Sequence, residues 1–167
     1  MNRAAPILLP LVVGCVGQRS AQRTNDVVAQ FNLKHDLRYV PAEGLTFCNI
    51  WAWDFSRAMG AEVPHTVDGR ELTANEYGRP GGWFETRGVA LGWHEVRSTG
   101  SVLAEVNAGN VVIAVLNNPG GHGHITPVVP DLHRVMVANV GGQNFQRGPI
   151  EEAYGHFMPQ VRYWVHA

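Results

Sequence analysis

The sequence predicts an α+β fold, with helices early in the chain and antiparallel strands late. Before residue 61 apolar residues recur at helical spacing, whereas after residue 110 short β-branched runs alternate with tight turns. A chain of 167 residues, 45% hydrophobic and 16% charged, also suits one globular domain with a substantial core. We therefore expect a single domain over residues 24–167, preceded by a polar linker over residues 16–23.

The helices are expected mainly in the first half of this domain. Cap residues, Gly and Pro stops and apolar spacing set the predicted bounds. The predicted elements are a helix at 24–31, an extended piece at 37–41, a helix capped by Thr46 and ended by Gly60, a turn at 67–70, helices at 71–77, from 83 onward and at 101–107, and a strand at 92–96.

The sheet is expected in the second half of the domain. Residues 111–116 (VVIAVL) are all apolar and mostly β-branched, which is typical of a strand buried on both faces. Further strands are predicted at 125–129, 135–140 and 160–166, with a turn at 130–131. The short connections predict that these strands pair in antiparallel fashion.

Residues 1–15 have the features of a targeting segment. Arg3 supplies a short positive region, and the apolar run that follows suits a secretory signal but is too short to span a bilayer. The four residues that end at Cys15 (VVGC) resemble a bacterial lipobox, in which that cysteine would carry a lipid anchor. We expect export to the periplasm or cell envelope; a frayed or buried N-terminal segment is the alternative.

Charge and cysteine content narrow the function classes. The formal charge is −1 and there is no long basic or acidic run, which argues against a nucleic-acid partner or a polybasic membrane patch. The two cysteines are Cys15 and Cys48, so lipidation or removal of Cys15 would leave Cys48 unpaired. An unpaired thiol in an exported protein is a candidate reactive group, and a Cys15–Cys48 disulfide is the alternative. A monomer is expected.

Cys48 lies in the first turn of the predicted helix that ends at Gly60. Free N–H groups and the positive end of the helix dipole stabilise a thiolate there, which lowers the thiol pKa. Cys48 shares a helix face with Ala52, Phe55 and Met59, so its sulfur should point toward whatever the helix packs on. The alternative is that Cys48 is a small buried core residue.

A cysteine nucleophile needs a base, and the base needs an orienting group. His124 stands at the start of the predicted strand 125–129, and Asn139 lies near the end of the next strand. In an antiparallel hairpin these two positions are neighbours, so the Asn139 amide oxygen could accept from the His124 ring. His122 is an alternative base, and Gln143 or Asn144 are alternative orienting residues.

This order of residues resembles the papain-like peptidases of the NlpC/P60 and CHAP group. The resemblance is carried by Tyr39, 46–49, 123–129 and 137–139, and it covers roughly residues 37–60 and 110–140. Phe-Cys-Asn stands at 47–49 where that family usually has Asp-Cys-Ser. The segment 65–109 is inserted between the two matched parts, and we expect it to cover the substrate groove.

The resemblance implies a papain-like fold with N-terminal helices packed on a small antiparallel sheet. It also implies that Cys48 is the nucleophile, His124 the base and Asn139 the orienting residue, with Tyr39 beside the oxyanion site. The implied activity is that of a cysteine peptidase or amidase that cleaves an amide bond, in peptidoglycan or a peptide, without a metal or organic cofactor. A non-catalytic wall-binding lipoprotein and an antibacterial effector or phage-type lysin are the alternatives.

Further candidates are weighed against structural roles. Asn49 and Trp83 are candidate substrate contacts, although Trp83 could instead pack the middle segment on the core. His122 and His124 could bind zinc together with His94 or His65, but the usual ligand spacings are absent. The glycine-rich run 120–123 lacks the Lys-Ser/Thr of a phosphate-binding loop and precedes a strand.

Overall fold

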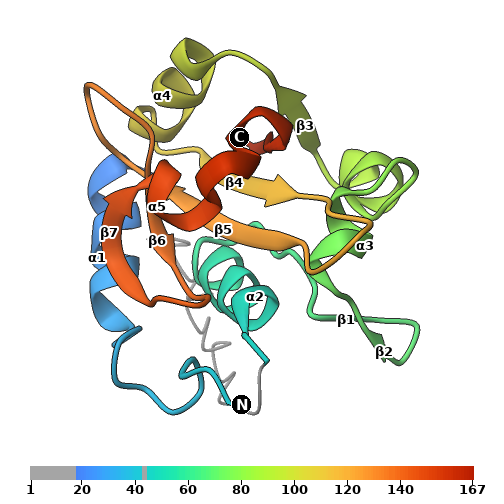
Figure 1. The fold of residues 1–167 in the computed structure, drawn as a ribbon. Helices are drawn as coiled ribbons and strands as arrows, with labels where there is room; N and C mark the ends of the chain where they lie inside the picture. Colours follow the sequence, from blue (N-terminus) through green and yellow to red (C-terminus); the bar gives the residue numbers. More distant parts are fainter. Residues whose placement is uncertain (1–17, 43–44) are drawn as a thin grey trace, which may run out of the picture.

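A computed structural model describes residues 18–42 and 45–167 and shows an α+β fold (Figure 1). Its main feature is a six-stranded sheet of order β3-β8-β4-β5-β6-β7, in which every neighbouring pair is antiparallel. The strands are β3 (Trp93–Val96), β4 (Val111–Leu116), β5 (His124–Val129), β6 (Met136–Asn139), β7 (Phe145–Pro149) and β8 (Arg162–His166). The antiparallel sheet expected from the sequence is thereby confirmed.

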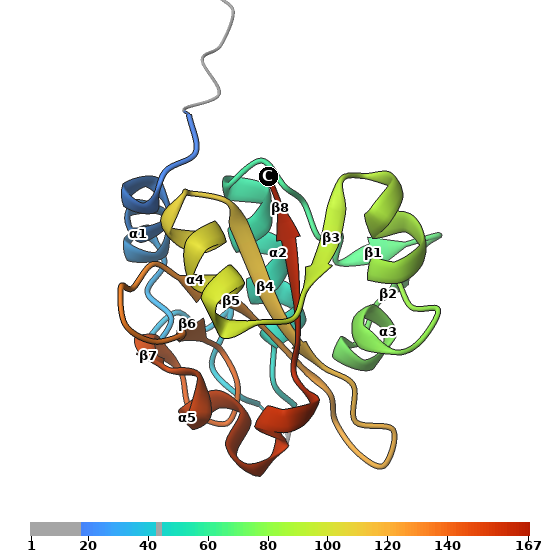
Figure 2. The ribbon, with the colours of Figure 1, turned by 90° about the horizontal axis from the view of Figure 1, so that it is seen from above.

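The helices cover both faces of this sheet. They are α1 (Ala21–Gln30), α2 (Cys48–Ala58), α3 (Ala74–Gly78), the π-helix η1 (Phe84–Gly88), α4 (Thr99–Asn107), α5 (Ile150–Tyr154) and the 3₁₀ helix η2 (Gly155–Gln160). Figure 1 shows α4 above and α2 below the central strands, and Figure 2 shows the same layers from above. None of the helices in the described part of the chain is long and apolar enough to cross a membrane.

Strand β4 joins two hydrophobic cores because successive side chains of a strand point to opposite faces. Ile113 and Val115 lie in the core formed with α1 and α2, whereas Ala114 and Leu116 lie in the core formed with α4 and α5. All residues of β4 are buried. The apolar run at 111–116 therefore predicts its position correctly, at the centre of the sheet.

Helix α2 begins at Cys48 and rests on the sheet. Its N-cap is Phe47, and no side chain caps it, so the predicted cap by Thr46 is wrong. Gly60 follows the helix with φ +70°, a conformation that favours glycine and confirms the predicted stop. Trp51 Nε1 donates to Ala138 O of β6 (2.7 Å), which fixes the helix against that strand.

The segment 65–92 folds beside the β3–β8 edge of the sheet. It begins with a hairpin of β1 (Thr66–Val67) and β2 (Arg70–Glu71), whose two-residue turn has positive φ at both positions. Because 70–71 pair as a strand, α3 starts only at Ala74, later than the helix predicted at 71–77. An aromatic cluster then packs this segment on the sheet: Tyr77, Trp83, Phe84, Trp93 and Trp164.

Several predicted boundaries need correction. Residues 18–23 are docked on the domain instead of forming a free linker, since Arg19 donates to Met59 O, Gly60 O and His166 O. Ser20 caps α1, which therefore starts three residues before the predicted 24. Residues 37–39 form a turn, not an extended piece, and no prediction covered β7, α5 and η2. The predicted targeting segment 1–15, with Cys15, lies outside the described residues.

Candidate active site

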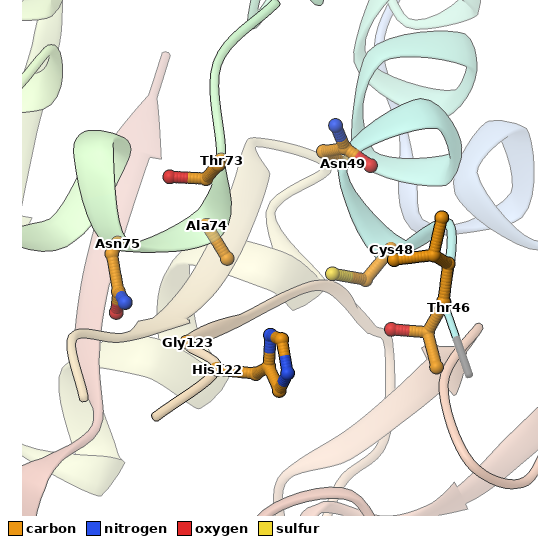
Figure 3. Close-up of a pocket in the computed structure, with 9 residues that line it drawn as sticks. Thr46, Cys48, Asn49, Thr73, Ala74, Asn75, His122 and Gly123 are labelled. Carbon is orange, nitrogen blue, oxygen red and sulfur yellow. The ribbon is translucent and has the colours of Figure 1, made fainter. Parts of the chain in front are cut away.

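Cys48 is the first residue of α2, and its side chain points inward. It is 5% exposed, and Ala52, Phe55 and Met59 on the same helix face are buried as predicted. Figure 3 shows its sulfur at the edge of a hollow that opens in front of the helix start. It is the free cysteine of the described residues.

His124 and Asn139 meet as the antiparallel strands predict. The His124 Nε2 atom and the Asn139 Oδ1 atom are 2.7 Å apart. Asn139 Nδ2 donates to Gln143 O (2.7 Å), which directs the amide oxygen toward the imidazole. Nε2 must then carry the ring proton, which leaves Nδ1 as the basic nitrogen of the neutral ring.

A bulge in β6 aims Asn139 at this position. The register between β6 and β7 shifts between Val137 and Asn139, and regular pairing of β6 with β5 ends at Val137. The carbonyl of Ala138 consequently accepts from two side chains, Trp51 Nε1 (2.7 Å) and Thr126 Oγ1 (2.6 Å). The bulge therefore ties together the nucleophile helix, the strand of the base and the orienting residue.

Cys48 and His124 favour each other's charged forms. Burial acts to raise the pKa of the Cys48 thiol, but the hydrogen bond and charge of His124, with the backbone N–H groups of Ile125 and Asn49, outweigh it and lower the pKa. Burial acts to lower the pKa of His124, but the hydrogen bond and charge of Cys48, with the hydrogen bond to Asn139, raise it. Each residue thus stabilises the charged form of the other.

Tyr154 braces the other side of the base, a role that the sequence did not indicate. Its ring meets the His124 ring edge-on, with centroids 5.0 Å apart. Its hydroxyl donates to Ala114 O (2.7 Å), and this hydrogen bond fixes the Tyr154 ring to the central strand β4. The imidazole is therefore fixed by packing as well as by Asn139.

Asn75 of α3 holds the loop that leads into His124. Its Oδ1 accepts from Asn118 N (2.7 Å), and its Nδ2 donates to Asn118 O (3.1 Å) and Gly121 O (3.0 Å). A Cβ on Gly123 would lie 2.4 Å from Asn75 Oδ1, so only glycine allows this close approach. The loop and Asn75 are 43 residues apart in sequence, and no local pattern predicts the contact.

Two hollows flank the Cys48–His124 pair. One, of about 320 Å³, is lined by Cys48 and by α3 residues, including Asn75. The other, of about 420 Å³, is lined by His124 and Asn139. Thr46, His122 and Gly123 line both, so the hollows adjoin there. Thr73, Ala74 and Asn75 of the segment 65–109 thus form part of the wall of the hollow beside Cys48.

The predicted substrate contacts Tyr39 and Trp83 are buried in the hydrophobic core instead. Tyr39 is 1% exposed, and its hydroxyl donates to Asp54 Oδ2 (2.7 Å). Trp83 is 5% exposed and packs edge-on against Phe84, and the hollow that it lines is separate from the two beside Cys48. Neither residue is among those that line the two hollows at the site.

The remaining candidates take positioning roles or lie at the rim. Asn49 lines the hollow beside Cys48, but its Nδ2 donates to Leu72 O (3.0 Å) and Figure 3 shows its amide turned away from the sulfur. His122 is exposed at the rim, and its ring points into the hollow. Asn144 is used elsewhere, since its Nδ2 donates to Leu33 O and Tyr39 O.

The zinc alternative finds no support in the described part of the chain. There, no group of three or more His, Cys, Asp or Glu side chains is placed to hold a metal ion.

Comparison with protein-family models gives no match, and a search of curated proteins likewise gives none.

Proposed function

We propose that this protein is a cysteine hydrolase that cleaves an amide bond, with Cys48 as nucleophile, His124 as base and Asn139 as orienting residue. One observation carries the proposal: a histidine is hydrogen-bonded to Asn139 through Nε2 and paired with a helix-start cysteine whose pKa is lowered. A buried structural cysteine in an apolar core has a raised pKa and needs no oriented base.

The chemistry follows from this arrangement. The Cys48 thiolate attacks the amide carbonyl, and backbone N–H groups at the start of α2 stabilise the oxyanion of the tetrahedral intermediate. Its collapse breaks the C–N bond, and the leaving amine takes the His124 proton. Water then attacks the thioester while His124 accepts a proton, which releases the carboxylic acid and restores Cys48.

The proposal extends to the fold family and the substrate. Helix-start cysteine, strand-start histidine and neighbouring asparagine support a papain-like enzyme similar to the NlpC/P60 and CHAP group. Peptidoglycan is the proposed substrate because of that similarity and because residues 1–15 resemble an export signal. The two hollows beside the pair offer space for the two halves of a cleaved amide.

The test is digestion of purified peptidoglycan by the full chain, with released fragments identified by mass spectrometry. We expect new amine and carboxyl termini with wild type and none with Cys48→Ala. Cys15→Ser is the matched control because it also removes a thiol, and it should retain the activity. Fragments that persist in Cys48→Ala would refute the mechanism. Binding without cleavage by all variants would favour the wall-binding alternative.

A further inference from the structure

We infer that the Thr46 hydroxyl is the side-chain donor of the oxyanion hole, an inference that rests on the proposed function. Thr46 lies two residues before Cys48 and lines both hollows. A substrate amide that extends from one hollow to the other would therefore pass Thr46. Figure 3 shows its hydroxyl oxygen pointing into the hollow on the side where the Cys48 sulfur lies.

Among the residues that the structure describes, the Thr46 hydroxyl has no hydrogen-bond partner. Its position suggests an N-cap, yet the structure gives α2 no side-chain cap. Within the described residues, the hydroxyl makes no hydrogen bond, in contrast to Ser20 and Ser98, which cap α1 and α4. A polar group at the mouth of a site, without a structural partner there, is a candidate for contact with substrate.

The oxyanion must form close to Thr46. The carbonyl carbon bonds to the Cys48 sulfur, so its oxygen lies beside the first turn of α2, where N–H groups have no intrahelical acceptor. Trp51 N is the first amide of the helix to bond back, to Phe47 O (3.1 Å). The Cys48 N–H and the Thr46 hydroxyl therefore approach the oxyanion from the same segment.

The other polar side chains at this hollow are less suited. The Asn49 amide is turned away from the sulfur and donates to Leu72 O. The Asn75 amide donates both of its hydrogens to the loop before His124. His122 also points into the hollow, but it belongs to the segment of the base, toward which the leaving amine must lie.

Two reagents separate an oxyanion donor from a residue that only shapes the site. p-Nitrophenyl acetate acylates Cys48 through a tetrahedral oxyanion and releases p-nitrophenolate, whereas iodoacetamide alkylates by displacement of iodide and forms no oxyanion. Both rates are measured on the full chain by mass spectrometry of the Cys48 peptide, which excludes labelling at Cys15. Cys48→Ala defines the background.

We expect Thr46→Val to slow acylation by about 10²-fold, the typical effect of losing one oxyanion-hole donor. Alkylation should be unchanged in rate and pH dependence, and Thr46→Ser should restore acylation. Equal acylation by Thr46→Val and wild type would overturn the inference, as would an equal loss in both reactions. A selective loss in His122→Ala, with Thr46→Val normal, would assign the donor to His122 instead.

The outcomes also separate this inference from the proposed function. A wild type whose Cys48 reacts with neither reagent would refute the hydrolase and the oxyanion donor together. A reactive wild type with an unaffected Thr46→Val would refute the donor alone.

Discussion

Replacement of Asn75 by alanine should weaken the fold and the site together. The substitution removes three hydrogen bonds to the loop that precedes His124, of 2.7, 3.1 and 3.0 Å. Each such bond contributes about 0.5–1.5 kcal/mol net, so the free energy of unfolding should fall by about 1.5–4.5 kcal/mol. The freed loop should also let His124 move, which slows alkylation of Cys48 at neutral pH.

Urea unfolding and iodoacetamide labelling measure the two effects. Asn118→Ala is the matched control, because its side chain makes one exposed bond of 3.3 Å to His122 O and its backbone stays bound to Asn75. This control should change the free energy of unfolding by less than about 0.5 kcal/mol. If Asn75→Ala behaved like Asn118→Ala in both assays, the positioning role would be refuted.

Three further results are expected at the site. Cys48→Ala should lower the pKa of His124 in an NMR titration, because the thiolate that raises it is gone while burial, which lowers it, remains; an unchanged pKa would exclude the ion pair. Asn139→Ala should lower that pKa as well and slow alkylation of Cys48, and an unaltered rate would show that the orienting bond is dispensable. Gly123→Ala should destabilise the protein by about 1–3 kcal/mol in urea, since its Cβ would lie 2.4 Å from the nearest side-chain oxygen. Gly142→Ala, whose Cβ meets nothing within 4 Å, is the control, and equal stabilities would contradict this reasoning.

The parts of the site that local patterns control were predictable from the sequence. The first-turn position of Cys48 follows from helical spacing, and the 2.7 Å contact of His124 with Asn139 follows from the geometry of a hairpin. The buried strand 111–116 follows from its apolar run. In each case the relevant neighbours are close in sequence or fixed by one regular element.

The parts that were missed depend on contacts between distant segments. Asn75 reaches a loop 43 residues away, and the Tyr154 hydroxyl reaches Ala114 across 40 residues. The family resemblance places Tyr39 beside the oxyanion site, but its hydroxyl donates to Asp54 Oδ2. The sequence predicts Thr46 as the cap of α2, yet Phe47 is the N-cap and no side chain caps the helix. Tertiary packing determines each of these positions, and the periodicity of the sequence does not predict such packing.

The central claim is that His124 activates Cys48, and the pH dependence of Cys48 alkylation tests it most directly. The rate of iodoacetamide labelling of the Cys48 peptide is measured from acid to alkaline pH in wild type and His124→Ala. Wild type should react well below the pKa of an ordinary thiol, because His124 and the backbone N–H groups outweigh burial. In His124→Ala burial dominates, so the midpoint should move to higher pH. A wild-type midpoint at or above that of an ordinary thiol, unchanged by His124→Ala, would show an inert core cysteine and contradict the account.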